Sequence, residues 1–414
     1  MNMHVEVAAT VPVAAAVPVA AAPAGGLDER AKRVADEAAR HADAVDREGR
    51  FPAEAVAALK AERLLGIQVP RSLGGEGASM SEIAELCAIL GRACSAAAMV
   101  FAMHHIKLAS LVTHGQDSAW HGALMERIAG EQLLIASSTT EAGIGGDLRN
   151  SLCAVEAQDG ADGATFRLTK EASVISYGAQ ADLILATARR HPGAATSDQV
   201  LVALLADQIT LERTSVWDTL GMRGTCSDGF LLKAEGLPLA QVLQKPFAEI
   251  AAQSMLAASH LLWGSVWFGI SSYAVDRARA FVQGEARKKP GQVPPGALRL
   301  AEAANELQAM KSTIVAGLAR YEAAKGDPDA LSAIGFSIML NNVKTTVSAQ
   351  AVDIVQRALS VVGIAGYKNG TPFSLGRQLR DVLSAPLMIS NDRILSNTAN
   401  LLLVQKGSGK LLSA

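Results

Sequence analysis

The spacing of apolar residues divides the chain into three regions. From residue 27 to about residue 129, apolar positions recur at helical spacing, as in "LDERAKRVADEAARHADAVDREG" and "AEAVAALKAERLLG". Pro52 precedes the second run, and the glycines of "VPRSLGGEGAS" indicate a turn before another helix over residues 80–94. The pattern predicts an N-terminal helical domain over residues 27–132.

Between residues 133 and 240 the apolar runs become short. They are "LLIASS", "CAVEAQ", "ATFRLTK", "ADLILATAR", "QVLVALLA" and "GFLLKAEG", and Gly, Asp or Pro bounds them. Runs of this length are typical of strands, so we expect roughly six or seven of them. The sequence therefore predicts a central antiparallel β-domain over residues 133–240.

Helical spacing returns in residues 241–414. The pattern predicts helices over residues 248–283, 295–324, 329–362 and 385–404, separated by loops such as "EARKKPGQVPPG" and "GIAGYKNGTPFSLG". These helices form a predicted C-terminal bundle, and the fold class is α+β. Residues 1–26 hold an Ala/Pro-rich run broken by Pro12, Pro18 and Pro23, which indicates a disordered tail, with a signal peptide as the alternative.

Composition narrows the class of protein. The chain has 414 residues, half of them hydrophobic and 19% charged, and a formal net charge of -2 that gives no electrostatic basis for binding nucleic acid or an anionic membrane. No segment holds an unbroken transmembrane-length apolar run, so we expect a cytoplasmic protein. Cys87, Cys94, Cys153 and Cys226 show no CxxC spacing, which predicts reduced structural thiols and no metal site.

The order of the regions and five separated motifs resemble the acyl-CoA dehydrogenase family. "PRSLGGEGAS" resembles its Pro-x-x-x-Gly-Gly-x-Gly turn, and "TTEAGIGGD" is similar to its Thr-Glu-Pro-x-Ala-Gly-Ser-Asp loop, with Ala142 for Pro and Gly146 for Ser. "SVISYGAQAD", "LGMRGTCSDGFLL" and "VVGIAGYKNGTPFSLGRQLRD" resemble three later motifs in the family's order. The resemblance implies the family's fold, with a C-terminal four-helix bundle, and a bound FAD.

In the β-domain the resemblance implies contacts with the flavin ring. Backbone amides and hydroxyls of an extended Ser/Thr segment can bind the polar edge of an isoalloxazine, and glycine lets the main chain approach closely. The implied contacts are Thr139, Thr140, Gly146 and Ser176. An ordinary polar β-turn is the alternative reading of the same residues.

Further FAD contacts are implied in the C-terminal region. Arg287 lies near the family's arginine that reaches the pyrophosphate from a neighbouring subunit, since a guanidinium fits phosphate oxygens. Gly363 and Gly366 lie where the main chain approaches the adenine half of FAD. A solvated basic loop and a simple inter-helix turn are the respective alternatives.

The family's catalytic glutamate has no counterpart at the counted position. The carboxylate removes the α-proton of a thioester and stands about eight residues after an Arg-Asp pair. Counting from Asp381 reaches Ile389, and the alternative position on an earlier helix falls near Ala252, with Gln253 beside it and Glu249 three residues earlier. Neither usual position holds a base.

Other polar residues near these positions are candidates. Asp392 lies about one helical turn after Ile389 and is the candidate base, with pairing to Arg393 or helix capping as the alternative. His104 and His105 lie near where some relatives line the substrate pocket, although packed or surface histidines are the simpler expectation. Arg380 and Asp381 are expected to form a structural pair or a cap at the start of the last helix.

The resemblance implies an FAD-dependent oxidoreductase acting on an acyl thioester of CoA or an acyl carrier protein, with the usual glutamate base absent. The alternative is a flavin-dependent monooxygenase of the same fold, because "GSVWFGISSYAVDRARAFVQGEARKKPGQVPP" looks closer to that branch, although the histidine common near the end of those enzymes is missing. A non-catalytic relative is a third class. We expect a homodimer or homotetramer, served by an electron-transfer partner or a flavin reductase.

Overall fold

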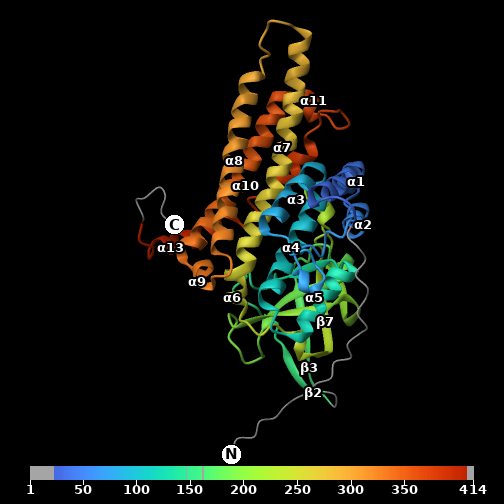
Figure 1. Cartoon of the computed structure of the whole chain (residues 1–414), viewed down its shortest axis with the longest axis vertical. Helices are drawn as coiled ribbons and strands as arrows, with labels where there is room; N and C mark the ends of the chain where they lie inside the picture. Colours follow the sequence, from blue (N-terminus) through green and yellow to red (C-terminus); the bar gives the residue numbers. More distant parts are fainter. Residues whose placement is uncertain (1–22, 146, 161–162, 408–414) are drawn as a thin grey trace, which may run out of the picture.

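The computed structural model describes residues 23–145, 147–160 and 163–407. Most of the predicted N-terminal tail, residues 1–22, lies outside the described residues. Helices, a β-domain and long helices follow one another along the chain (Figure 1). The β-domain lies at the lower end of Figure 1, and the long C-terminal helices extend to the opposite end.

The N-terminal region is helical, as predicted. Its helices are α1 (Leu27–Glu48), α2 (Ala53–Ala61), α3 (Met80–Ala93), α4 (Ser95–His114) and α5 (Ala119–Glu131). Ser79 and Glu82 start α3 with reciprocal hydrogen bonds to each other's backbone N–H groups. By length and composition alone α4 could cross a membrane, and 83% of its most apolar window is buried inside the fold.

Seven strands are described in the β-domain, and they form two sheets. The strands are β1 (Ile135–Ser138), β2 (Glu156–Gly160), β3 (Gly163–Ala172), β4 (Leu183–Arg189), β5 (Gln199–Leu205), β6 (Ile209–Ser215) and β7 (Gly229–Pro238). The strand orders are β1-β4-β5 and β2-β3-β7-β6. All pairs are antiparallel except β1 with β4, which are parallel. Between these two strands the chain forms β2 and β3 of the other sheet, and it then enters β4 in the same direction as β1.

The sheet containing β4 is covered on both faces. Leu183 and Leu185 pack in one apolar cluster, whereas Ile184 and Ala186 pack in another. The alternation of side chains along a strand places successive residues on opposite faces. The uninterrupted apolar character of β4 therefore follows from burial on both sides.

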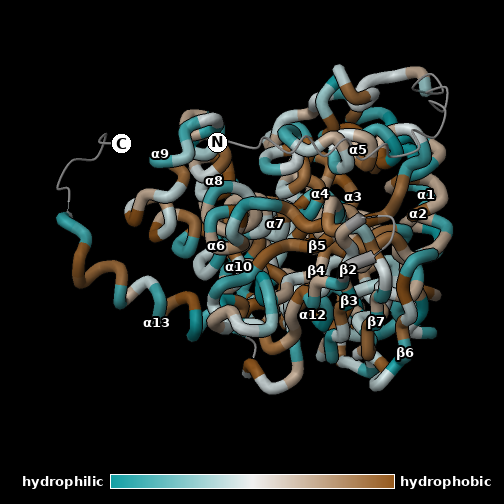
Figure 2. Tube along the Cα trace, turned by 90° about the horizontal axis from the view of Figure 1, so that it is seen from below, coloured by the Kyte–Doolittle hydropathy of each residue, from teal (hydrophilic) through white to brown (hydrophobic). Residues whose placement is uncertain are grey.

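The C-terminal region consists of long helices and short connecting ones. They are α6 (Phe247–Ile250), a π-helical turn (Ala251–Met255), α7 (Leu256–Lys288), α8 (Ala297–Ala324), α9 (Pro328–Ser332), α10 (Ile334–Val362), α11 (Ile364–Tyr367), α12 (Gly376–Val382) and α13 (Asn391–Leu402). Helix α7 packs against α10 and α8 on one side and against α3 and α4 on the other, so it joins the two helical regions. Helix α13 contacts α10 and extends away from the body (Figure 2).

Two sequence expectations can be compared directly with these elements. All four cysteines are free, and Cys87, Cys94 and Cys153 are buried, as predicted for structural thiols. The helix predicted over residues 385–404 begins only at Asn391, because residues 383–390 form consecutive turns that include Pro386. This turn segment carries side chains to the cavity described next.

Candidate functional site

A cavity of about 580 Å³ lies where α4, the β-domain and the C-terminal helices meet. Its size falls in the range of ~300–1,000 Å³ that is typical of small-molecule sites. The wall is mainly apolar, with hydroxyl groups on the β-domain side and two charged residues, Lys107 and Arg380, among the described lining residues. Three walls can be traced to local sequence patterns.

The first wall is one face of α4. Met99, Met103, Ile106 and Lys107 line the cavity, and their spacing of three and four residues places them on the same side of the helix. Lys107 is only 3% exposed, and within the described part of the chain its ammonium has one hydrogen-bond partner, Met255 Sδ at 3.1 Å. Burial lowers the pKa of Lys107 to about 7, and the charge of Lys170 adds to this effect.

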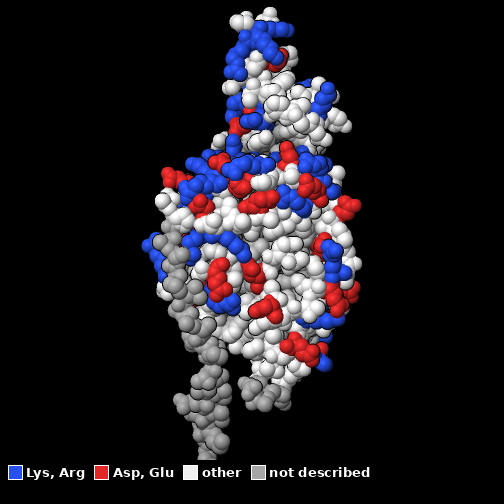
Figure 3. Space-filling model, turned by 90° about the vertical axis from the view of Figure 1, so that its right-hand side faces the viewer, with Lys and Arg blue, Asp and Glu red and all other residues white. Residues whose placement is uncertain are grey.

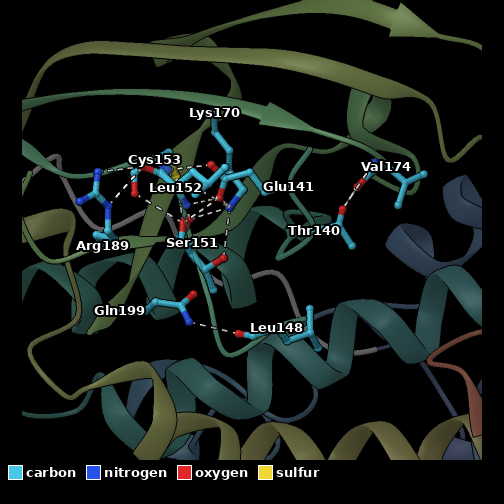
Figure 4. Close-up of polar contacts among 11 residues, drawn as sticks. Thr140, Glu141, Leu148, Ser151, Leu152, Cys153, Lys170, Val174, Arg189 and Gln199 are labelled. Carbon is cyan, nitrogen blue, oxygen red and sulfur yellow. Dashed lines mark hydrogen bonds and ion pairs between the residues drawn. The ribbon is translucent and has the colours of Figure 1, made fainter. Parts of the chain in front are cut away.

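The second wall is the hydroxyl-rich side of the β-domain, and it brings together three residues expected at the flavin. Thr139, Thr140 and Ser176 all line the cavity. Thr140 Oγ1 donates to the carbonyl of Val174 at 2.9 Å (Figure 4), so segments distant in sequence are held side by side. Ser176 Oγ lies 2.8 Å from Ser227 Oγ. Gly146, the fourth expected contact, lies outside the described residues.

A buried ionic cluster fixes the loop that follows Thr140. Glu141 Oε1 accepts the N–H of Cys153 at 2.6 Å, and Glu141 Oε2 accepts the hydroxyl of Ser151 at 2.7 Å. Lys170 Nζ, fully buried, lies 3.3 Å from Glu141 Oε2 (Figure 4). It also donates to the carbonyl of Thr187 at 2.8 Å. These contacts hold the loop against β3 and β4, so the Thr139–Thr140 wall rests on a rigid support.

Arg380 and Asp381 have separate partners, so the expected pair between them is not formed. Arg380 makes a two-pronged ion pair with Asp46 at the end of α1, and Asp381 accepts the N–H of Met222 at 2.7 Å. Both residues lie in α12 rather than at the start of the last helix. Gly221 is required at this junction, since a Cβ there would lie 2.1 Å from the carbonyl oxygen of Arg380.

The third wall is the turn segment before α13. Met388 and Ile389 line the cavity, so the position counted for the family's glutamate does face the interior. Ile389 has a φ of 49°, which is unusual for a β-branched residue. Lys344 holds this turn because its ammonium donates to the carbonyl of Ile389 at 2.7 Å and to the carbonyl of Ala385 at 3.1 Å.

The structure does not bring the candidate base Asp392 to the cavity. Asp392 is exposed in the first turn of α13 and is outside the cavity lining. The expected pair between Asp392 and Arg393 is not formed, because Arg393 donates to the carbonyl of Gly145. Glu249 is exposed in α6, and Ala252 lies in the π-helical turn, so neither supplies a carboxylate to the lining.

His104 and His105 are packed residues. His104 Nε2 lies 2.7 Å from the carbonyl of Leu65, and His104 Nδ1 accepts the N–H of Ile135 at 3.0 Å, which defines a neutral ring. Burial lowers the pKa of His104 to about 4. His105 Nε2 contacts the carbonyl of Leu64 at 3.1 Å. Both rings join α4 to the connection after α2.

Arg287, Gly363 and Gly366 lie away from the cavity lining. Arg287 is exposed near the end of α7, where Lys and Arg side chains gather at the tip of the α7–α8 pair (Figure 3). Gly363 ends α10 with a φ of 65°, and Gly366 is buried against Leu359. The contacts with FAD that the resemblance implies for these three residues remain predictions.

Trp263 and Lys107 are two polar residues of the lining that sequence reasoning missed. Trp263 Nε1 is buried without a hydrogen-bond partner in the described residues. Buried donors in this state are uncommon, and because Trp263 lines the cavity its N–H is available to an acceptor bound there. The sequence did contain a signal for Lys107, because it is the only Asp, Glu, Lys or Arg between Ser95 and Leu111 and therefore an isolated charge in an apolar segment.

Comparison with known proteins identifies the family. The N-terminal domain of acyl-CoA dehydrogenases matches residues 27–131, and the C-terminal domain matches residues 250–392. The chain belongs to the acyl-CoA dehydrogenase family. The predicted order of an N-terminal helical domain, a central antiparallel sheet and a C-terminal helical domain is confirmed by this assignment. The relatives are flavin-dependent enzymes, so this family member is an oxidoreductase.

Individual relatives cover most of the chain. The L-evernosamine nitrososynthase of a Micromonospora strain is 29% identical over 359 residues, which are 83% of this chain and 81% of that protein. The structure of KijD3 in complex with dTDP has a TM-score of 0.77 at 22% identity, covering 92% of this chain and 98% of that one. FMN-bound TdsC from Paenibacillus sp. A11-2 has a TM-score of 0.78 at 17% identity, covering 94% and 99%. The last two establish a common fold.

Proposed function

We propose that this family member is a flavin-dependent monooxygenase that oxidises an amine nitrogen of a small organic substrate. The observation that carries the proposal is the cavity wall, which is apolar with hydroxyls on one side and presents Lys107 and Arg380 as its charged residues. The nitrososynthase relative supports an amine as the substrate class. A separate flavin reductase is part of the proposal, because the reaction consumes reduced flavin.

The cavity residues fit an isoalloxazine ring. Thr139, Thr140 and Ser176 form a polar edge, and the tryptophans and methionines of the lining supply apolar surface for the ring faces. Trp263 Nε1 is a donor without a partner in the described residues, and the ring carries acceptors for such a group. When bound, the reduced flavin supplies two electrons to dioxygen. Both FAD, expected from the resemblance, and FMN, bound by TdsC, carry this ring.

The charged residues of the wall favour a neutral amine. Lys107 is positively charged whenever it is protonated, and Arg380 is cationic although it is paired with Asp46. Positive neighbours disfavour a protonated amine, so the substrate nitrogen would enter with its lone pair free. A neutral nitrogen is the nucleophile that oxygen transfer requires. In the overall reaction, an amine, dioxygen and reduced flavin give a hydroxylamine, water and oxidised flavin, which balances both atoms and electrons.

Oxidation of an acyl thioester, which the sequence alone favoured, receives less support from the site. That reaction needs a base within hydrogen-bond reach of the α-carbon. Ile389 occupies the counted position in the wall, and Asp392 is exposed outside the lining. The two functions differ in what they require from flavin, because dehydrogenation reduces an oxidised flavin and oxygen transfer consumes a reduced one.

The test uses protein reconstituted separately with FAD and with FMN. The reduced, flavin-loaded protein is mixed with isotopically labelled dioxygen and a panel of amines, including amino sugars, aromatic amines and amino acids. We expect one labelled oxygen atom in a hydroxylamine or a further oxidised product from at least one class. If neither flavin binds, or if all panel members return unchanged while an acyl thioester is oxidised, the proposal is wrong.

We also propose self-association through the C-terminal helices. Val315 of α8 is 53% exposed, and Leu395 and Leu402 of α13 are 51% and 55% exposed, so apolar side chains face outward on these helices. Such surfaces mark protein contacts in many folds. Light scattering should give a dimer or tetramer at micromolar concentration. A monomer that still holds flavin would contradict this.

A further inference from the structure

Three lysines are buried in the described part of the molecule, and only one of them is left without oxygen partners. Lys170 lies against Glu141 and the carbonyl of Thr187, and Lys344 donates to two carbonyls and to Asn391. Lys107 has Met255 Sδ as its hydrogen-bond partner. A thioether is a weak acceptor, so most of the donor capacity of the Lys107 ammonium is unused.

The unused donors belong to a group that faces a ligand-sized space. Lys107 lines the cavity, is 3% exposed, and extends from the same helical face as Met103. An isolated buried ammonium is costly because the apolar interior does not replace its hydration. An anionic ligand group would both neutralise the charge and accept the free N–H donors.

We propose that Lys107 is the anchor for an oxyanion carried by the substrate, such as a carboxylate or phenolate at a position other than the nitrogen that is oxidised. This assignment rests on the proposed function in taking the cavity as the substrate site. It adds a second recognition element to the substrate class. A molecule that combines an amine with an anionic oxygen group would fit both features of the wall.

Other charged groups around Lys107 favour an anion as well. Lys170 lies close enough to lower the pKa of Lys107 further, and Glu141 is already engaged by Lys170 and backbone N–H groups. Arg380, the other charged residue among the described lining residues, is paired with Asp46. Because burial brings the pKa of Lys107 to about 7, anion binding at neutral pH should be accompanied by proton uptake.

The test measures binding of matched probes to the flavin-loaded, oxidised protein by isothermal calorimetry. The probes are benzoate, benzamide and benzylamine, which share a ring and differ in charge. A charge-assisted hydrogen bond in a buried site predicts that benzoate binds about ten- to hundredfold more tightly than benzamide. Benzylamine should bind most weakly. The preference for benzoate should fall above about pH 8, where Lys107 loses its proton.

Variants assign the preference to one side chain. Lys107→Met should reduce the benzoate preference to about threefold or less while flavin affinity stays within about threefold. Lys311→Met, an exposed lysine on α8, is the matched control and should behave as the wild type. If the variant does not fold, the wild-type probe series still decides, because equal affinities for benzoate and benzamide would overturn the proposal.

The remaining outcomes separate this inference from the proposed function. A Lys107→Met variant that loses flavin but keeps the benzoate preference would assign Lys107 to the cofactor and overturn the inference. The binding measurements involve no turnover, so a failure of oxygen transfer leaves their result unaffected. Conversely, oxygen transfer to amines without any preference for anionic probes would support the function and refute the oxyanion anchor.

Discussion

Lys170 and Lys107 are both buried lysines, but their surroundings differ in the polar partners that they supply. Lys170 is enclosed by Glu141, the carbonyl and hydroxyl of Thr187, and the thiol of Cys153. Lys107 lines an apolar cavity with Met255 Sδ as its partner. The first ammonium holds a loop in place, whereas the second is left available to a ligand.

The contrast shows how one residue type serves structure or recognition. A buried charge that is paired and hydrogen-bonded is tolerated, and removing its partner is strongly destabilising. A buried charge with few partners lowers stability and is retained where function requires it. The two sites therefore predict opposite effects when each lysine is replaced by methionine.

The largest effect is expected at the paired site. Lys170→Met leaves the buried Glu141 carboxylate without its cation, and breaking such a pair costs about 3–5 kcal/mol in the free energy of unfolding. Denaturant unfolding followed by circular dichroism measures this difference. Lys233→Met, which removes an exposed pair with Glu212, is the matched control and should change stability by less than ~1 kcal/mol. Equal losses in both variants would show that the Glu141 cluster is not an anchor.

Lys107→Met is expected to raise stability, in a manner that depends on pH. Because burial lowers the pKa of Lys107 from 10.5 to about 7, the unfolded chain binds a proton between these values that the folded chain releases. Stability of the wild type therefore rises with pH through this window, and the penalty of the buried charge is complete below about pH 7.

The variant should therefore be more stable than the wild type at about pH 6, by an amount on the order of a few kcal/mol, and this gain should shrink as pH rises toward 10.5. Denaturant midpoints of both proteins at several pH values test the prediction. A variant that is less stable than the wild type at low pH would show that Lys107 has stabilising partners after all.

A smaller effect is expected for a hydrogen bond between neutral groups in the hydroxyl-rich wall of the cavity. Thr140→Val removes the hydrogen bond to the carbonyl of Val174, and such bonds contribute about 0.5–1.5 kcal/mol. We expect a loss of stability of this size and a flavin affinity that is lower by about three- to tenfold. Thr165→Val in β3, with a longer 3.4 Å contact, is the control for flavin titration. Unchanged flavin affinity for Thr140→Val would place the ring elsewhere.

The sequence predicted the order of the three regions because hydrophobic spacing reflects which face of each element is buried. The short runs of β4 and β5 are strands, and the long patterns around residues 256–288 and 334–362 are helices. The parallel pairing of β1 with β4 was not predictable, since it depends on how the chain returns after the other sheet.

The candidate site was predicted only in part, because its walls come from segments that lie far apart in the sequence. Thr139, Thr140 and Ser176 were found because family motifs surround them, and the structure places them in one wall. Lys107 and Lys344 were missed, because their partners are brought near by tertiary packing of helices distant in sequence. The isolated charge of Lys107 in an apolar helix was the available signal.

Counting along the sequence located Ile389 correctly in the wall but could not place Asp392. The prediction assumed a continuous helix, in which a residue about one turn later would face the same side. The turn over residues 383–390, held by Lys344, changes the direction of the chain before α13 begins. Asp392 therefore points away from the interior that Ile389 reaches.

The central claim, that the cavity uses reduced flavin for oxygen transfer rather than oxidised flavin for thioester dehydrogenation, is tested most directly by an anaerobic titration. Flavin-loaded protein is mixed with short-, medium- and long-chain acyl-CoA in the absence of oxygen, and the visible absorbance of the oxidised flavin is followed. Our account predicts that the absorbance persists with every chain length, because the wall places Ile389 at the position of the dehydrogenase base. Stoichiometric bleaching by any of these thioesters would contradict it.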